Sequence, residues 1–264
     1  MCGYNLEEVK RSRESWSKSA NTYEKWYTTF EGAVETFVDL ALLRKYLPEN
    51  KNAKILDAAG GTGRITLPLA RMGYSVTLCD LSPGMLYVAK QKMLREGVCD
   101  KVKILECDIR NLNFPDEIFD FVLCWDGAIE AAKELIRVTK KGGRISVFLV
   151  NKWAAAVDGF YKDSDSTLAL IESTPSYVEH HGVEYRAVSP EEARKFFAAE
   201  GIRVLDIYAV CGWTDVLGIP EKVLESRDWD EKNFEQTTEI VLKLSKETSV
   251  KGMSRHLVLY GDKI

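Results

Sequence analysis

The stretch ILDAAGGTGR, residues Ile55–Arg64, decides the fold. It joins a short apolar strand, expected over Ala53–Ala59, to a helix expected over Arg64–Met72. Because glycine has no Cβ, a ligand can approach the backbone of such a turn closely, and the helix N-terminus adds N–H donors. Asp80 ends the next strand 20 residues after Gly60, close to the spacing at which an acid binds a ribose diol. The turn and Asp80 together indicate a nucleoside site.

Two other nucleotide-binding motifs are excluded. A dinucleotide fingerprint counted from Gly61 would need glycine at position 66, which is Thr66. A phosphate loop of the form G-x-x-x-x-G-K-[ST] does not occur in the sequence. The turn therefore favours a nucleoside ligand with little need for a pyrophosphate cradle.

Strands and helices alternate on both sides of this turn. Near-continuous apolar strands that alternate with helices are typical of a parallel sheet covered on both faces, and right-handed crossovers make it doubly wound. We therefore expect an α/β fold with a mostly parallel, seven-stranded sheet. The expected strands are 53–59, 75–80, 102–107, 119–125, 144–150, 202–210 and 255–260.

The remaining segments are predicted to surround this core within a single domain, residues 1–264. Helical periodicity over 13–46 predicts an N-terminal helical flap, residues 1–48, before a cofactor-binding core, residues 49–150. Two insertions, 151–188 and 212–250, are expected to cover the substrate. Within the first, Tyr177–Tyr185 resembles a hairpin, and Ser189 followed by Pro190 starts a helix.

Several ordered motifs resemble the class I S-adenosylmethionine-dependent methyltransferases, over roughly residues 50–150. The turn Asp57–Gly63 is similar to their first motif and Leu78–Leu86 to their second. Cys107–Ile109 resembles the third, and Phe119–Trp125 with Glu134–Arg144 resembles the later ones. Ala59 departs from the family, which commonly has glycine there. The resemblance implies a Rossmann-like methyltransferase fold, S-adenosyl-L-methionine as cofactor, and methyl transfer to an N, O or C atom.

The resemblance also implies residue roles in cofactor binding. The backbone of Ala59, Gly60, Gly61, Thr62 and Gly63 would cradle the amino-acid part of the cofactor. Asp80 would accept hydrogen bonds from both ribose hydroxyls, and Leu81 and Met85 would pack on the adenine. Asp108 would accept from the adenine amino group beside the Ile109 backbone, and Trp125 and Asp126 would border the methyl group.

Aromatic and histidine side chains extend the predicted site. Tyr23 and Trp26 of the flap are predicted to contact the cofactor, because a positive sulfonium is attracted to aromatic faces. Core packing is the alternative explanation for such a helical stripe. Five residues are predicted substrate contacts: Trp153, His180, His181, Arg186 and Trp213.

The sequence does not identify a catalytic base. The N-P-P-Y loop of amino-group nucleic-acid methyltransferases and the Pro-Cys nucleophile of pyrimidine C5 enzymes are both absent. Histidine is the usual base at neutral pH, but His180 and His181 also fit an exposed hairpin tip. Only two oxygen ligands, Asp126 and Asn151, follow the fourth and fifth strands, so we expect no metal site.

Composition narrows the choice of substrate. Lys and Arg number 36 against 40 Asp and Glu, which gives a net charge of −4 and disfavours a nucleic-acid partner. The sequence lacks a membrane-length apolar run and a signal-like start, and its six cysteines form no C-x-x-C pair, so we expect a cytoplasmic location. A small-molecule methyl acceptor is favoured. An RNA-modifying methyltransferase, a cofactor-binding non-catalytic subunit and a nicotinamide oxidoreductase are the alternatives; the oligomeric state is not predicted.

Overall fold

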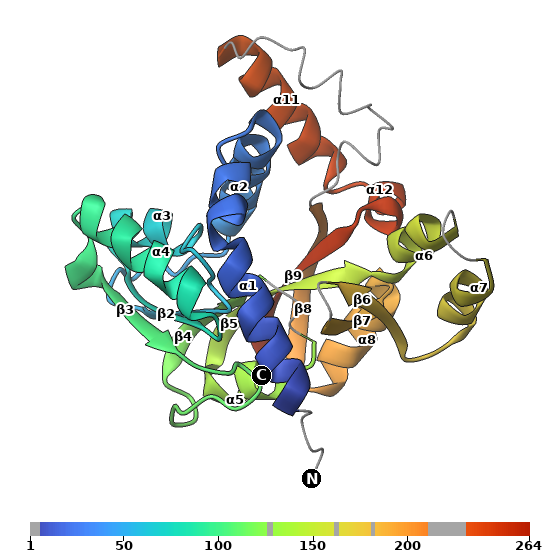
Figure 1. Cartoon of the computed structure of the whole chain (residues 1–264), viewed down its shortest axis with the longest axis horizontal. Coiled ribbons are helices and arrows are strands. Elements are labelled where there is room, and N and C mark those ends of the chain that lie inside the picture. Colours follow the sequence, from blue (N-terminus) through green and yellow to red (C-terminus); the bar gives the residue numbers. More distant parts are fainter. Residues whose placement is uncertain (1–5, 126–128, 161–163, 181–182, 211–230) are drawn as a thin grey trace.

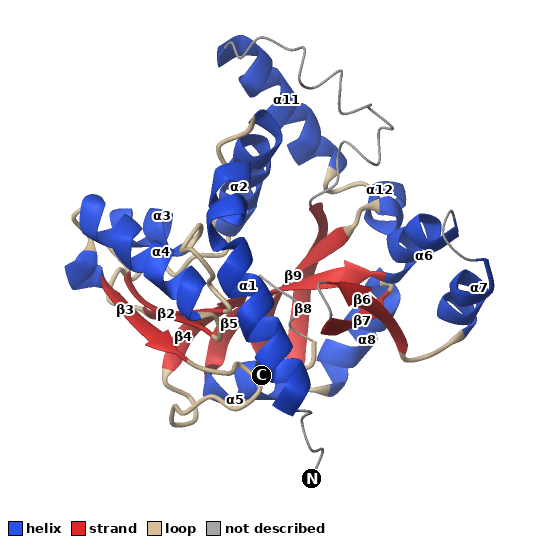
Figure 2. Ribbon diagram, viewed as in Figure 1, coloured by secondary structure: helices blue, strands red, loops and turns tan. Residues whose placement is uncertain are grey.

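A mixed α/β sheet with helices on both faces forms the molecule (Figures 1 and 2). The computed structural model describes residues 6–125, 129–160, 164–180, 183–210 and 231–264. The strands are β1 Lys54–Ala58, β2 Ser75–Asp80, β3 Val102–Glu106, β4 Phe119–Cys124, β5 Thr139–Asn151, β6 Ser176–His180, β7 Val183–Val188, β8 Ile202–Val210 and β9 His256–Lys263. The helices are α1 Leu6–Trp26, α2 Phe30–Leu43, α3 Thr66–Arg71, α4 Pro83–Arg95, the 3₁₀-helix η1 Cys99–Lys101, α5 Ala132–Val138, α6 Lys152–Phe160, α7 Ser164–Glu172, α8 Pro190–Ala199, α11 Glu231–Leu244 and α12 Thr248–Met253.

The strand order confirms the doubly wound α/β prediction. Strands β3, β2, β1, β4 and β5 lie side by side and parallel, while β9 runs antiparallel between β5 and β8. The order reverses between β1 and β4, since the chain first adds strands on one side of β1 and then on the other. A ligand in such a sheet binds outside the carboxyl ends of the strands at this switch point.

The predicted number of strands was wrong, because the sheet of the described residues has nine strands rather than seven. The hairpin β6–β7 was predicted, but its membership of the main sheet was not. β4 pairs with β5 only as far as Cys124 and Val147, whereas β5 continues to Asn151. The free edge of this extension pairs with β7 at Val150–Ala187 and Asn151–Val188, which satisfies its backbone groups.

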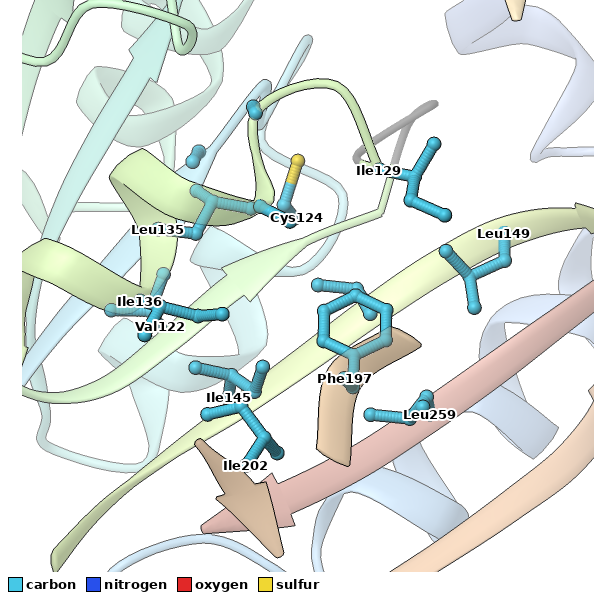
Figure 3. Close-up of a cluster of buried hydrophobic side chains, with 14 of the residues drawn as sticks. Val122, Cys124, Ile129, Leu135, Ile136, Ile145, Leu149, Phe197, Ile202 and Leu259 are labelled. Carbon is cyan, nitrogen blue, oxygen red and sulfur yellow. The ribbon is translucent and has the colours of Figure 1, made fainter. Parts of the chain in front are cut away.

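Each face of the sheet has its own apolar core, because successive side chains of a strand point to opposite faces. α5 and α8 cover one face, where Val122, Leu149 and Phe197 pack together (Figure 3). α2, α3 and α11 cover the other face over Phe121 and Leu123. Both faces of the parallel strands are therefore buried, as the continuous apolar runs predict.

Capping residues in the sequence predicted where helices start. The exact bounds of some helices, and the two helices α6 and α7, were not predicted. Ser189 caps α8 as predicted and forms a capping box with Glu192, and Ser82 caps α4 in the same way through its side chain. The helix after the glycine turn begins at Thr66 instead of Arg64. α6 and α7 form within 151–188, where no long periodicity was found.

The first helix lies across the sheet in Figure 1 and packs on α4. Ser17 Oγ lies 2.9 Å from Ser82 Oγ, and Glu24 accepts a hydrogen bond from Lys92 at 2.7 Å. Ser82 lies two residues after the end of β2, so α1 crosses the carboxyl edge of the sheet. In the described part of the chain, no helix is long and apolar enough to cross a membrane.

Candidate functional site

The glycine turn forms a tight loop at the carboxyl end of β1. Ala59, Gly61 and Gly63 all have positive φ, at 54°, 53° and 76°. A side chain with a Cβ strains at such angles, and Ala59 carries this strain where the family commonly has glycine. A Cβ on Gly61 would meet only the Met85 sulfur within 4 Å, at 3.9 Å. The space above Gly61 is therefore open to a ligand.

Asp80 faces this turn from the end of β2. Its Oδ2 accepts a hydrogen bond from the Gly61 N–H at 2.9 Å, and its Oδ1 accepts one from the Ser82 N–H at 2.8 Å. Burial raises the pKa of the Asp80 carboxyl, and these backbone donors oppose the rise. The two bonds fix the carboxylate in place while leaving lone pairs on both oxygens for further donors.

The side chain of Asp57 packs against the glycine turn. It is buried at the end of β1, and its Oδ2 accepts a hydrogen bond from the Thr66 hydroxyl. A Cβ on Gly60 would lie 2.9 Å from the Asp57 Cγ, so the carboxylate and the turn are in close contact. Burial raises the pKa of Asp57 to about 6, against the hydrogen bond from Thr66 and the charge of Arg64.

This pKa predicts a pH-dependent stability for the variant Asp57→Asn. Because the folded pKa lies above the value of 3.8 in the unfolded chain, folding favours the protonated acid, and the wild type loses stability as the pH rises from about 4 to 6. Asparagine does not ionise, so the variant should gain up to about 3 kcal/mol relative to wild type across this window. Urea unfolding at pH 4, 5, 6 and 7 measures the difference; a difference that does not change with pH contradicts the prediction.

The predicted adenine contacts lie beside Asp80. Met85 is buried next to the turn, Leu81 is half-buried, and Asp108 and Ile109 follow β3. Arg110 binds both oxygens of Asp108, through Nε at 2.9 Å and Nη2 at 2.7 Å. Burial raises the pKa of Asp108, but the hydrogen bonds from Arg110 outweigh it, so the pKa is lowered. An adenine amino group would share this carboxylate with Arg110.

Aromatic rings form the side of the site next to β4. The Trp125 indole stacks on Phe148 with ring centroids 4.6 Å apart and donates a hydrogen bond to Ser146 at 2.9 Å. From α1, the Tyr23 hydroxyl accepts a hydrogen bond from Tyr27 at 2.9 Å. Trp26 packs edge-on against Tyr27 and remains 41% exposed, so it lies at the rim.

A buried ion pair behind this aromatic wall was missed by the sequence reasoning. Arg64 Nη1 donates a hydrogen bond to Asp39 Oδ2 at 2.7 Å, and the two side chains are only 11% and 1% exposed. The Arg64 guanidinium carbon lies 4.6 Å from the Tyr27 ring centroid and 5.9 Å from that of Trp125. Two signals could have found the pair: an arginine directly after the glycine turn, and a lone acid on the apolar face of α2.

Two of the five predicted substrate residues, Trp153 and Arg186, have side chains in the described part of the chain, and these two make different contacts. Trp153, in the first turn of α6, is 39% exposed and lies beside the Lys152 ammonium. The Arg186 backbone N–H donates to Glu130, and its guanidinium lies over Phe196 of α8. His180 ends β6, and nothing is described of its side chain. Asp126, His181 and Trp213 lie outside the described residues.

Metal ligands are not grouped in the described ranges, where no cluster of three His, Cys, Asp or Glu side chains could hold an ion. Asn151, considered above as a ligand, has a structural role. Its amide nitrogen donates to the carbonyls of Lys251 and Ser254, and its oxygen accepts from the Trp153 N–H. These bonds anchor α12 and α6 to the end of β5.

S-adenosylmethionine fits the residues that are present. The open space above Gly61 would admit the amino-acid part of the cofactor. The oriented Asp80 carboxylate offers hydrogen-bond acceptors for the two ribose hydroxyls. Thr62 Oγ, buried in the same turn, has no hydrogen-bond partner within the described residues. A buried polar atom without a partner is uncommon in folded proteins, so its position in this turn is consistent with a polar ligand nearby.

Comparisons with known proteins identify the family that residues 55–143 match. Residues 55–143 match a family described as a methyltransferase domain. A ubiquinone/menaquinone biosynthesis C-methyltransferase, UbiE, from Pectobacterium carotovorum is 33% identical over 111 residues, 39% of this chain and 44% of the relative. The match thus spans less than half of that relative.

Solved structures extend the likeness of fold to most of the chain. A chain from the Haloferax volcanii complex between the Trm112 activator and a methyltransferase has a TM-score of 0.62 and 18% identity, covering 94% of this chain and 96% of that one. A methyltransferase of Thermotoga maritima has a TM-score of 0.57 and 18% identity, covering 95% and 99%. Residues 55–143, which carry the glycine turn, Asp80 and Asp108, belong to the class I S-adenosylmethionine-dependent methyltransferase superfamily.

Proposed function

We propose that this protein transfers a methyl group from S-adenosylmethionine to a nucleophilic N, O or C atom of a small molecule. One observation carries the proposal: the Asp80 carboxylate is held by two backbone N–H groups directly opposite an open glycine turn. The cofactor supplies an activated methyl group when bound. The chain then has to hold it, align an acceptor and keep water out.

In this proposal, three parts of the chain would share these tasks. Residues 49–150 would hold the cofactor through the turn, Asp80 and the side chains around Met85 and Asp108. The flap, residues 1–48, would shield it from water through α1 and its aromatic residues Tyr23 and Trp26. The insertions 151–188 and 212–250 would surround the acceptor. Alignment of two reactants in this way is worth roughly 7–11 kcal/mol of the barrier.

A small-molecule acceptor is supported by the acidic balance of the chain and by the matched relatives. The net charge of −4 gives little attraction for phosphates. UbiE, by its name, methylates carbon in quinone biosynthesis. Its match spans 39% of this chain and 44% of the relative, so the acceptor itself is left to experiment.

The activity test uses the purified chain with isotope-labelled S-adenosylmethionine. Fractions of a metabolite extract and total RNA serve as separate acceptor pools. Each pool is assayed at low salt and at about 0.3 M salt, which weakens binding to phosphates. Label in a small-molecule fraction supports the proposal. Label only in RNA at low salt would establish the RNA-modifying alternative, and binding of the cofactor without any labelled product would favour a non-catalytic subunit.

A further inference from the structure

Arg64 directly follows the glycine turn, and its guanidinium is not fully enclosed by its ion-pair partner. Its guanidinium carries five N–H donors, of which Nη1 bonds to Asp39. In the described part of the chain, the buried side-chain atoms without a partner include Asp39 Oδ1 but no nitrogen of Arg64. The Arg64 side chain is 11% exposed, so part of it reaches solvent-accessible space.

The sheet topology shows where that space lies. A ligand whose ribose meets Asp80 at the end of β2 has β3 on one side and β1 and β4 on the other. Asp108, after β3, is on the adenine side. The end of the ligand away from adenine must cross the turn toward β4, where Trp125 follows the strand. The Arg64 guanidinium lies in this place, next to the rings of Trp125 and Tyr27.

The charge of this subsite is fixed. Burial alone would lower the pKa of the Arg64 guanidinium, but the neighbouring groups, Asp39 and Glu35 among them, outweigh it and raise the pKa. Asp39 is 1% exposed and Tyr27 packs on the guanidinium, so the side chain is held before any ligand arrives. A planar, preorganised guanidinium with free donors suits a carboxylate.

We propose that Arg64 binds the carboxylate at the amino-acid end of S-adenosylmethionine, and that Asp39 is the positioning residue that holds it there. This rests on the proposed function. It gives the residue after the glycine turn a role in recognising the cofactor, and it couples the turn to α1 through the Tyr27 ring. An acceptor molecule bearing a carboxylate is the other source of the same chemistry, and the test separates the two.

The test compares two ligands by calorimetric titration: S-adenosylmethionine and its decarboxylated analogue, which lacks only the carboxylate. Arg64→Gln should weaken S-adenosylmethionine binding about 10-fold to 100-fold, as expected for one charge-assisted contact, and change binding of the analogue less than about threefold. Arg64→Lys should recover part of the loss. Asp39→Asn should show the same ligand selectivity with a smaller loss, which a merely structural role would not produce.

A matched control is Arg71→Gln at the end of α3, the helix that follows Arg64, where the side chain is 57% exposed and pairs with Glu96. It should affect neither ligand. Equal weakening of both ligands by Arg64→Gln would overturn the proposal and leave Arg64 a structural residue. Unchanged binding of S-adenosylmethionine would also overturn it and direct the search to an acceptor carboxylate. If the wild type binds neither ligand, the proposed function itself fails.

Discussion

Replacing Asp80 by alanine should weaken binding of S-adenosylhomocysteine about 100-fold to 10,000-fold. The carboxylate would accept hydrogen bonds from two ribose hydroxyls, and a hydrogen bond to a charged group contributes about 1.5–3 kcal/mol. The substitution also removes the acceptor for the Gly61 N–H, so the turn loses the contact that shapes it. Calorimetric titration at neutral pH measures the affinity.

The control for Asp80 is Asp100→Ala, which removes an exposed carboxylate in η1, before β3. Its affinity for S-adenosylhomocysteine should equal that of the wild type. Circular dichroism should show that both variants keep the fold. If Asp80→Ala folds and binds within threefold of the wild type, the assignment of this carboxylate to the ribose is wrong.

Adding a single methyl group at Gly84 should displace the first helix. A Cβ at this position would lie 2.6 Å from the Ser17 carbonyl oxygen and 2.7 Å from the Ser17 Cα, both backbone atoms. Carbon atoms pack at about 3.5–4 Å, so in Gly84→Ala α1 has to move by roughly 1 Å away from α4. Alanine has a higher helix propensity than glycine, so the substitution should not destabilise α4 itself.

Hydrogen exchange over residues 6–26 measures this displacement. We expect faster exchange in α1 of Gly84→Ala and about 10-fold weaker S-adenosylhomocysteine binding, because Tyr23 and Tyr27 move with the helix; a loss of that size is about 1.4 kcal/mol. Gly252→Ala in α12 is the matched control, since a Cβ there meets nothing within 4 Å. Unchanged exchange in α1 together with unchanged affinity would show that the helix does not close the site.

The sequence predicted the part of the site that depends on local structure. The glycine turn, the end of β2 at Asp80 and, outside the site, the capping of α8 by Ser189 are all short-range features, set by backbone freedom, strand periodicity and capping chemistry. Motif spacing then assigned these residues to a nucleoside. Their roles toward the cofactor remain predictions, which the Asp80 and Arg64 variants test.

The long-range features were beyond such reasoning. The sequence predicted the hairpin β6–β7. Its place in the main sheet depends on the extension of β5 past β4, with which β7 pairs. The contact of the Arg186 guanidinium with Phe196 of α8 and the hydrogen bonds of Asn151 next to α6 and α12 were not predicted either. A local sequence pattern does not determine which distant residue such a side chain will contact.

By itself the sequence determined the layered α/β fold and the turn that faces Asp80, because periodicity and glycine placement act within a few residues of one another. The tertiary structure alone decided that Asp39 of α2 meets Arg64, and that Ser17 of α1 rests against Gly84. These contacts join segments that are far apart in the sequence. They form because the burial of apolar faces sets how the helices and the sheet pack, and this packing decides which polar side chains meet.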